Sequence, residues 1–335
     1  MRSLQIVDGY TSALTLRETQ KAIKLVKDTF ANELAAALNL ERVSAPFIVR
    51  KGSGINDDLN GVERKVEFDT KEIEGTAEIV QSLAKWKRTA LKAYGYGVDE
   101  GLYTNMNAIR RDDDCDNVHS IFVDQWDWER VISKEERNIE FLKDIVKKIV
   151  GAIDNTQKIA HKAFPQLKKE LATDVFFVTT QELEDMYPDK TPKEREDIIA
   201  KEKGVVFVMQ IGDLLKSGIK HDGRAPDYDD WKLNGDLLFW NETLRHAFEV
   251  SSMGIRVDSE SLAYQLKAAN AEDRMKYDYH KGIADGTLPL TIGGGIGQSR
   301  LSMLILEKAH IGEVQVSLWP DKMVEDCKNN GINLL

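Results

Sequence analysis

Short segments rich in β-branched and aromatic residues recur along the chain, and in many of them polar and apolar residues alternate. Alternation of this kind is typical of antiparallel strands that bury one face and expose the other. Helical patterns do not fall regularly between these segments, which disfavours a doubly wound parallel sheet. We therefore predict an α+β fold with a large antiparallel β-sheet flanked by helices. The expected strands cover residues 43–49, 79–83, 102–109, 121–128, 175–179, 205–211, 236–240, 248–257 and 314–319.

Two long stretches have the apolar spacing of an amphipathic helix. Apolar residues recur every three to four positions in residues 15–39 and 135–161, with charged residues between them. Shorter or broken helices are expected at residues 193–203 and 259–280. No linker rich in glycine, serine or proline divides the 335 residues, so we expect a single domain over residues 1–335.

The charge and cysteine content narrow the class of protein. The chain has 46 Lys and Arg against 56 Asp and Glu, and its net charge of −10 disfavours a partner bound mainly through phosphates, such as tRNA or DNA. Its 2 cysteines are too few for a disulfide framework and fit a reducing compartment. Residues 1–30 are rich in charge, and no apolar run reaches the ~18 residues that a membrane helix needs. We expect a cytoplasmic protein that binds neither nucleic acid nor membranes.

The glycine-rich segment at residues 291–306 is the clearest candidate for ligand binding. Its glycines, Gly295 among them, would let a ligand approach the backbone closely, and a helical apolar pattern follows them. Arg300 would add a planar cationic fork for a phosphate. The glycine spacing fits neither a P-loop nor a dinucleotide fingerprint. Tight packing of a helix against the sheet explains the glycines equally well at this stage.

Residues 101–130 have the pattern of a strand, an acidic loop and a second strand. Arg110 ends the first strand, and Gln125 and Asp127 share one face of the second because side chains alternate along a strand. Polar residues that alternate with tryptophans suit a sheet face that binds a polar ligand. The alternative is a solvated strand face.

A turn-rich loop and a basic segment form a third candidate. Residues 51–61 carry two carboxylates, and residues 82–88 alternate cations with a tryptophan. The cations would suit a carboxylate or a phosphate. A run such as Lys85, Lys87 and Arg88 is more often a solvated surface, however.

Two carboxylates form the fourth candidate. Asp236 and Glu249 each lie in a β-like run, so both side chains can point from one face of a sheet. Hard oxygen ligands of this kind suit Mg²⁺ that bridges nucleotide phosphates. For each carboxylate alone, a surface position on a strand is the alternative.

Taken together, these motifs resemble one family, the ammonia-dependent asparagine synthetases or aspartate–ammonia ligases. That family is similar in fold to the catalytic domain of class II aminoacyl-tRNA synthetases. The resemblance implies an antiparallel sheet flanked by helices, a homodimer, and residues 101–130 and 291–306 as the second and third class II motifs. One departure is a very short connection between Trp231 and Leu233. The segments that carry the resemblance are residues 58–61, 81–88, 100–104, 119–130, 224–231, 251–257 and 293–300.

The resemblance implies a ligase that converts L-aspartate, ATP and ammonia to L-asparagine, AMP and pyrophosphate through β-aspartyl adenylate. In it, Arg110 would hold the α-phosphate, Arg300 the γ-phosphate, and Asp57 would attract ammonium and accept its proton. The catalytic set would be Asp57, Arg110, Gln125 and Arg300. Aspartate would be bound by Ser82, Lys87, Gln125, Asp127 and Arg256. ATP would be framed by Arg110, Ser120, Val123, Tyr228, Asp229, Ser252, Gly295 and Arg300, and Mg²⁺ would be held by Asp236 and Glu249.

Two rival classes were weighed against this resemblance. An aspartyl-type aminoacyl-tRNA synthetase would carry an anticodon-binding domain before the catalytic one, and the motifs leave no room for it. A non-catalytic paralogue is disfavoured because the arginines and carboxylates expected for ATP and Mg²⁺ are intact. Cys115 lies among carboxylates and Cys327 has no nearby histidine, so neither is expected to cleave glutamine. Free ammonia is therefore the expected nitrogen donor.

Overall fold

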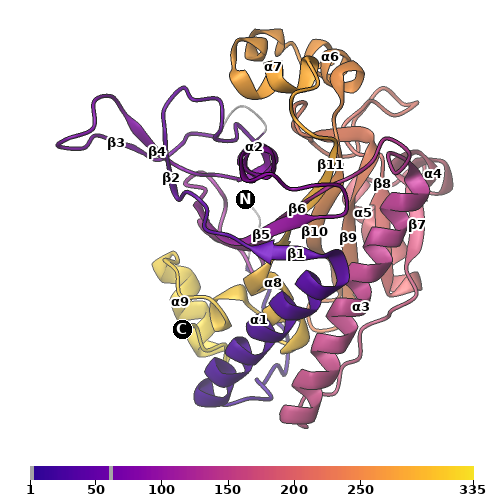
Figure 1. Ribbon diagram of the computed structural model, residues 1–335. Coiled ribbons are helices and arrows are strands. Elements are labelled where there is room, and N and C mark those ends of the chain that lie inside the picture. The colour runs from indigo at the N-terminus through magenta and orange to yellow at the C-terminus, as the bar shows by residue number, and fades with distance from the viewer. Residues whose placement is uncertain (1–3, 60–62) are drawn as a thin grey trace.

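An eight-stranded sheet forms the centre of the molecule, with the strand order β1-β5-β6-β11-β10-β9-β8-β7 (Figure 1). The computed structural model describes residues 4–59 and 63–335. Neighbouring strands from β5 to β8 are antiparallel, whereas β1 and β7 run parallel to their single neighbours at the two edges. The predicted large antiparallel sheet in an α+β fold is therefore confirmed, with a parallel strand added at each edge. The strands are β1 (Leu40–Arg42), β5 (Gly101–Ile109), β6 (Phe122–Val131), β7 (Phe176–Thr179), β8 (Val205–Met209), β9 (Asp229–Asn241), β10 (His246–Arg256) and β11 (Thr291–Gly297).

Two long helices, α1 (Leu16–Leu38) and α3 (Ile139–Ala163), pack against each other and cover one face of the sheet (Figure 1). Thr15 and Glu18 form a capping box that starts α1, because each side chain bonds the backbone N–H of the other. The apolar stripe of α1 then faces the sheet, where the ring of Phe30 lies 4.6 Å from that of Trp126. This layer contains the main hydrophobic core.

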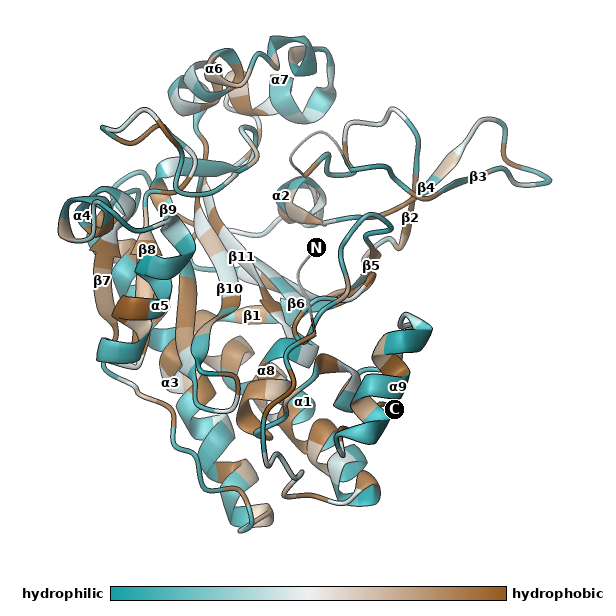
Figure 2. Cartoon of the chain, turned by 180° about the vertical axis from the view of Figure 1, so that it is seen from behind, coloured by the Kyte–Doolittle hydropathy of each residue, from teal (hydrophilic) through white to brown (hydrophobic). Residues whose placement is uncertain are grey.

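Shorter helices complete the structure. α4 (Thr180–Met186) and α5 (Pro192–Lys203) cover β7 to β10. α8 (Gln298–Ile305) follows β11 directly, and Figure 2 shows apolar residues along β7 and β8. The remaining helical segments are α2 (Ala84–Tyr94), α6 (Ser259–Ala268), α7 (Asp278–Ala284), α9 (Asp321–Asn329) and the 3₁₀ turns Glu272–Lys276 and Ile311–Glu313.

A small three-stranded sheet projects from the body of the molecule on the side of β5 (Figure 1). It consists of β2 (Ile48–Arg50), β3 (Glu67–Phe68) and β4 (Ala77–Ile79), in the order β2-β4-β3. The loop that follows β2 leads back toward the main sheet and carries Asp57. Within the described residues, no helix is long and apolar enough to cross a membrane.

Three of the predicted strands are wrong. Residues 43–47 are irregular, and only the last two residues of the predicted run 43–49 lie in β2. Of residues 79–83, only Ile79 lies in a strand. Residues 314–319 follow a 3₁₀ turn without pairing. Val316 and Leu318 are 71% and 76% exposed, so the alternation there reflects no buried strand face. The region 259–280 is broken into two helices and a 3₁₀ turn, as predicted. Trp231 and Leu233 lie within the continuous strand β9, so no loop separates them.

Candidate active site

A cavity of about 850 Å³ opens over the central strands of the large sheet and is lined by all of the predicted site residues. The lining comes from β6, β9, β10 and β11, and from the segments around Asp57, α2 and Arg224. Residues far apart in the sequence thus meet at one place. The predicted residues found there are Asp57, Ser82, Lys87, Arg110, Ser120, Val123, Gln125, Asp127, Tyr228, Asp229, Asp236, Glu249, Ser252, Arg256, Gly295 and Arg300.

The glycines of β11 make room for side chains from the neighbouring strands. Gly295 pairs with Asp127 of β6, and a Cβ atom at Gly295 would collide with the amide of Gln125. A Cβ atom at Gly293 would lie 2.7 Å from Nη2 of Arg256. The groups packed over Gly293 and Gly295 are therefore side chains of the cavity, not a helix as the packing alternative supposed.

One end of the cavity holds buried cations, each paired with a carboxylate. Lys87 forms an ion pair with Asp127 and donates to the carbonyl oxygen of Trp128 at 3.0 Å. Its side chain is 1% exposed because Lys87 lies on the inner face of α2, so the interpretation of this run as a solvated surface is wrong. Burial lowers the pKa of Lys87, and the field of Asp127 opposes that effect.

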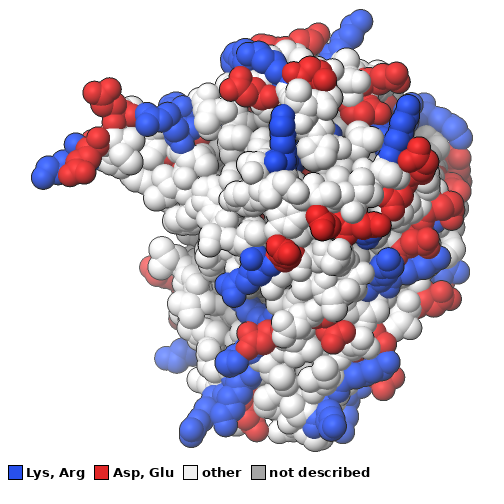
Figure 3. All heavy atoms as spheres, viewed as in Figure 1, with Lys and Arg blue, Asp and Glu red and all other residues white. Residues whose placement is uncertain are grey.

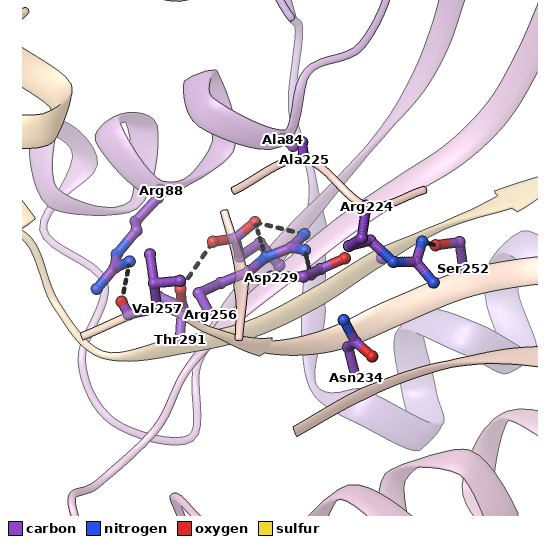
Figure 4. A network of polar contacts seen from close by, with 12 residues as sticks. Ala84, Arg88, Arg224, Ala225, Asp229, Asn234, Ser252, Arg256, Val257 and Thr291 are labelled. Atoms are coloured by element: carbon purple, nitrogen blue, oxygen red, sulfur yellow. Dashed lines mark hydrogen bonds and ion pairs between the residues drawn. The ribbon is translucent and has the colours of Figure 1, made fainter. Parts of the chain in front are cut away.

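Arg256 is the second buried cation. It donates to Glu129 at 3.1 Å and pairs with Asp229, and Figure 4 shows Asp229 beside its guanidinium. Glu129 also accepts from the hydroxyl of Thr291 at 2.7 Å. Carboxylates of the protein thus already pair with both cations, and these ion pairs line this end of the cavity.

The other end of the cavity carries arginines and two further carboxylates. Arg300 Nη1 lies 3.4 Å from Oε2 of Glu249, and Arg224 Nη2 lies 2.7 Å from Oδ1 of Asp236. Figure 4 shows Arg224 pointing at Ser252 of β10. Arg110, just after β5, donates from Nε to the carbonyl oxygen of Gln81 at 3.4 Å. Arg110, Arg224 and Arg300 all line the cavity, and three guanidinium groups suit an anion with several phosphates.

Asp236 and Glu249 differ in their affinity for a proton. The pKa of Asp236 is raised to about 7, mainly by burial, with Arg224 opposing the shift and Glu249 adding to it. Burial acts in the same direction on Glu249, but Arg300 and Arg224 hold its pKa below the usual value. Within residues 4–59 and 63–335, no group of three or more His, Cys, Asp or Glu side chains is arranged to hold a metal ion.

Asp57 is another buried carboxylate of the cavity. Its side chain is 1% exposed, and Oδ1 accepts the backbone N–H of Leu59 at 3.1 Å. Oδ2 has no hydrogen-bond partner in the part of the chain that is described. Burial raises the pKa of Asp57, while Lys85 lowers it and Asp227 raises it. The neighbouring motif residues 60–61 lie outside the described residues.

Sequence reasoning missed several residues of the site. Glu129 continues the alternation of Gln125 and Asp127 along β6, so the period of two could have revealed it. Arg224 is the first residue of the motif 224–231, from which only Tyr228 and Asp229 were predicted as site residues. Lys85 and Asp227 form a buried ion pair at 3.1 Å, which no local pattern indicates.

The fold and this cavity define the class of protein. The structure resembles that of Entamoeba histolytica asparaginyl-tRNA synthetase in complex with asparaginyl-adenylate, with a TM-score of 0.67 and 14% identity over 90% of this chain and 66% of that chain. It also resembles the Pyrococcus horikoshii asparaginyl-tRNA synthetase complexed with asparaginyl-adenylate, with a TM-score of 0.64, 15% identity and coverage of 90% and 70%. The chain therefore has the fold of a class II aminoacyl-tRNA synthetase catalytic domain.

Sequence comparison then gives the family. Residues 17–331 match the family model of aspartate–ammonia ligase. The chain is 61% identical to the aspartate–ammonia ligase of Clostridium tetani, over 99% of this chain and 98% of that protein. It is 60% identical to the enzyme of the same name from Lactobacillus johnsonii, over 99% and 100%. This chain belongs to the aspartate–ammonia ligase family, which confirms the resemblance seen in its motifs.

Proposed function

We propose that this protein makes L-asparagine from L-aspartate, ATP and ammonia through β-aspartyl adenylate, releasing AMP and pyrophosphate. The observation that carries the proposal is the division of one cavity into two chemically different ends. Guanidinium groups gather at one end and suit a triphosphate, whereas paired ammonium, guanidinium and carboxylate groups at the other suit a zwitterionic amino acid.

In the first step, an oxygen of the aspartate β-carboxylate attacks the α-phosphorus of ATP, and the bond to pyrophosphate breaks. Arg110 is assigned to the α-phosphate, where charge develops, and Arg300 to the γ-phosphate. Ser120, Val123, Tyr228, Asp229, Ser252 and Gly295 frame the nucleotide in this proposal.

Mg²⁺ fits the pair Asp236 and Glu249. The two carboxylates lie on neighbouring strands, and each raises the cost of a negative charge on the other unless a cation is near. Two protein oxygens suffice for Mg²⁺ when phosphate oxygens and water supply the remaining ligands. When bound, the ion would neutralise charge on the phosphates.

Aspartate is assigned to the end of the cavity that contains the paired cations. Its α-carboxylate would be bound by Arg256 or Lys87, and Ser82 would donate a hydrogen bond. Asp127 and Gln125 would accept hydrogen bonds from its α-amino group. On binding, aspartate would thus replace hydrogen bonds between charged side chains of the site with hydrogen bonds to itself.

The second step forms the amide. Asp57 would accept a proton from ammonium, and the nitrogen would attack the β-carbonyl carbon as the bond to AMP breaks. The phosphate of the departing AMP would take the second proton. A carboxylate with a raised pKa is suited to this role because it binds a proton more readily than a solvated one.

The working form is proposed to be a cytoplasmic homodimer of one catalytic domain per chain. Figure 3 shows a largely uncharged area on the face that carries β5 and the small sheet. Exposed apolar side chains such as Phe47 and Ile48, which are 42% and 48% exposed, support an interface on the small sheet. Two free cysteines support a reducing compartment.

The direct test is an assay of AMP, pyrophosphate and asparagine release. All three products should appear only when aspartate, ATP and an ammonium salt are present together. Exchange of labelled pyrophosphate into ATP should need aspartate but no ammonium. Asparagine formation without AMP release would contradict the proposal.

A further inference from the structure

Two buried carboxylates near the cavity each have an oxygen without a partner. They are Oδ2 of Asp57 and Oδ1 of Asp227, on side chains that are 1% and 0% exposed. Neither atom has a hydrogen-bond donor among the described residues. A buried carboxylate oxygen without a donor is costly, so such an atom indicates a missing cation or donor.

The two carboxylates belong to one electrostatic cluster. Lys85 Nζ lies 3.1 Å from Oδ2 of Asp227 and 3.4 Å from the carbonyl oxygen of Asn56, which directly precedes Asp57. Asp227 raises the pKa of Asp57, and Lys85 lowers it. Lys85 therefore spans the distance between the Asp57 loop and Asp227.

Asp227 is held in place by further donors. Arg274 donates to it at 2.8 Å, and Nε2 of His280 lies 3.0 Å from the same oxygen. Nδ1 of His280 has no hydrogen-bond partner within the described chain. These contacts all go to Oδ2 and leave Oδ1 free.

The cluster contains carboxylates and cations from several segments of the chain. Its carboxylates are Asp57, Asp58, Glu78 and Asp227, and the fixed cations paired with them are Lys65, Lys85 and Arg274. His280 also acts on Asp227. Arg110 also acts on Asp57, but the proposed function assigns its charge to the α-phosphate.

We propose that Asp57 and Asp227 together form the ammonium site, in which Asp227 binds the cation and Asp57 takes its proton. This inference rests on the proposed function and adds Asp227 and its positioning residue Lys85 to it. Ammonium supplies one positive charge and N–H donors for both free oxygens. Proton transfer to Asp57 leaves neutral ammonia, whose lone pair attacks the β-carbonyl carbon while the bond to AMP breaks. The second proton, lost as the amide forms, goes to the phosphate of the departing AMP.

The two carboxylates have environments suited to these different roles. Burial opposes a charge on Asp227, but Lys85, His280 and Arg274 overcome it and hold its pKa far below the usual range. Asp57 instead has a raised pKa. A pair of carboxylates whose pKa values diverge can divide binding and proton transfer between them.

The test compares two nitrogen donors, one that binds as the ammonium cation and one that binds uncharged. Asp227→Asn should raise the KM for ammonium chloride by at least ~10-fold, the usual worth of a hydrogen bond to a charged group. Aspartyl hydroxamate formation from hydroxylamine, which is uncharged at neutral pH, should change little, as should aspartate-dependent pyrophosphate exchange. The matched control is Asp230→Asn, which removes a buried carboxylate paired with Arg137 outside the cavity. This control should leave the ratio of activity with ammonium to activity with hydroxylamine unchanged.

An unchanged KM for ammonium in Asp227→Asn, or an equal loss of activity with ammonium and with hydroxylamine, would overturn this inference. The proposed function would still stand if the wild type forms asparagine. Should Asp227→Asn fail to fold, wild-type protein saturated with a non-reactive analogue of β-aspartyl adenylate gives the answer. Ammonium chloride should raise its Tm above that in equal sodium chloride, and Asp57→Asn should abolish the difference. No such difference in the wild type would refute the ammonium site.

Discussion

The ammonium group of Lys87 donates to the carbonyl oxygen of Gly294 at 3.2 Å, across 207 positions of sequence. This bond joins the first turn of α2 to the middle of β11. It brings the basic segment and the glycine-rich segment, which sequence analysis treated separately, into contact. The geometry of the amino-acid end of the cavity therefore depends on both.

Replacing an arginine at the phosphate end should slow adenylate formation. We expect Arg110→Ala and Arg300→Ala each to lose ~3–4 kcal/mol of transition-state stabilisation, the range typical of a lost electrostatic donor. The measurement is kcat/KM in aspartate-dependent pyrophosphate exchange, with circular dichroism as the control for folding. Turnover close to that of the wild type in a folded variant would refute the assignment.

A methyl group at Gly295 should impair aspartate binding. The added Cβ would collide with Gln125 and force that side chain out of its place. We expect Gly295→Ala to raise the KM for aspartate more than that for ATP. The matched control is Gly151→Ala in α3, where a Cβ meets no atom within 4 Å. An equal effect of the two substitutions on aspartate binding would contradict this explanation.

Acid should destabilise the fold through His310. Burial lowers the pKa of this histidine from 6.5 to about 4, with Asp116 opposing the shift. The unfolded chain then binds more protons between these values, so stability falls as the pH drops from about 6.5 to about 4, by up to about 3 kcal/mol.

The variant that isolates this effect is His310→Asn. His310 Nδ1 accepts the backbone N–H of Gly312 at 3.0 Å, and an asparagine oxygen can also serve as such a cap without titrating. Urea unfolding at several pH values should show a smaller loss of stability for the variant in acid. Parallel curves for the two proteins would rule His310 out.

Neither cysteine should be needed for activity. Burial raises the pKa of Cys327 to about 11, and burial also raises that of Cys115, so both thiols stay protonated at neutral pH. Cys115→Ser with Cys327→Ser should retain ammonia-dependent turnover and lose some stability, because Cys327 is fully buried. Efficient asparagine synthesis by the wild type from glutamine in ammonia-free buffer would contradict this expectation.

Local periodicity predicted the central sheet and the two long helices well. Residues 15–39 and 135–161 carry one apolar face for many turns, and such a face is buried whatever the partner. Residues 314–319 show where this approach fails. Val316 and Leu318 alternate with polar residues as in a strand, but the chain places no partner strand beside them.

The cavity was predicted as a set of residues but not as a network. The family resemblance located Lys87 and Arg256, whereas the burial of Lys87 depends on α2 packing against β6, which is a tertiary contact. Asp227 was missed for the same reason, since its partners Lys85, Arg274 and His280 come from three separate segments.

The paired cations of the cavity have a consequence for selection among dicarboxylic acids. Lys87 and Arg256 already hold built-in carboxylates, so an incoming anion has to compete with them and gains little from charge alone. When an anion takes Lys87, Asp127 loses its partner, and only a ligand that also carries an ammonium group can replace that positive charge. Succinate, which matches aspartate in both carboxylates but has no amine, should therefore inhibit pyrophosphate exchange poorly. The enzyme would in this way ignore the abundant organic acids of a cell and respond to amino acids.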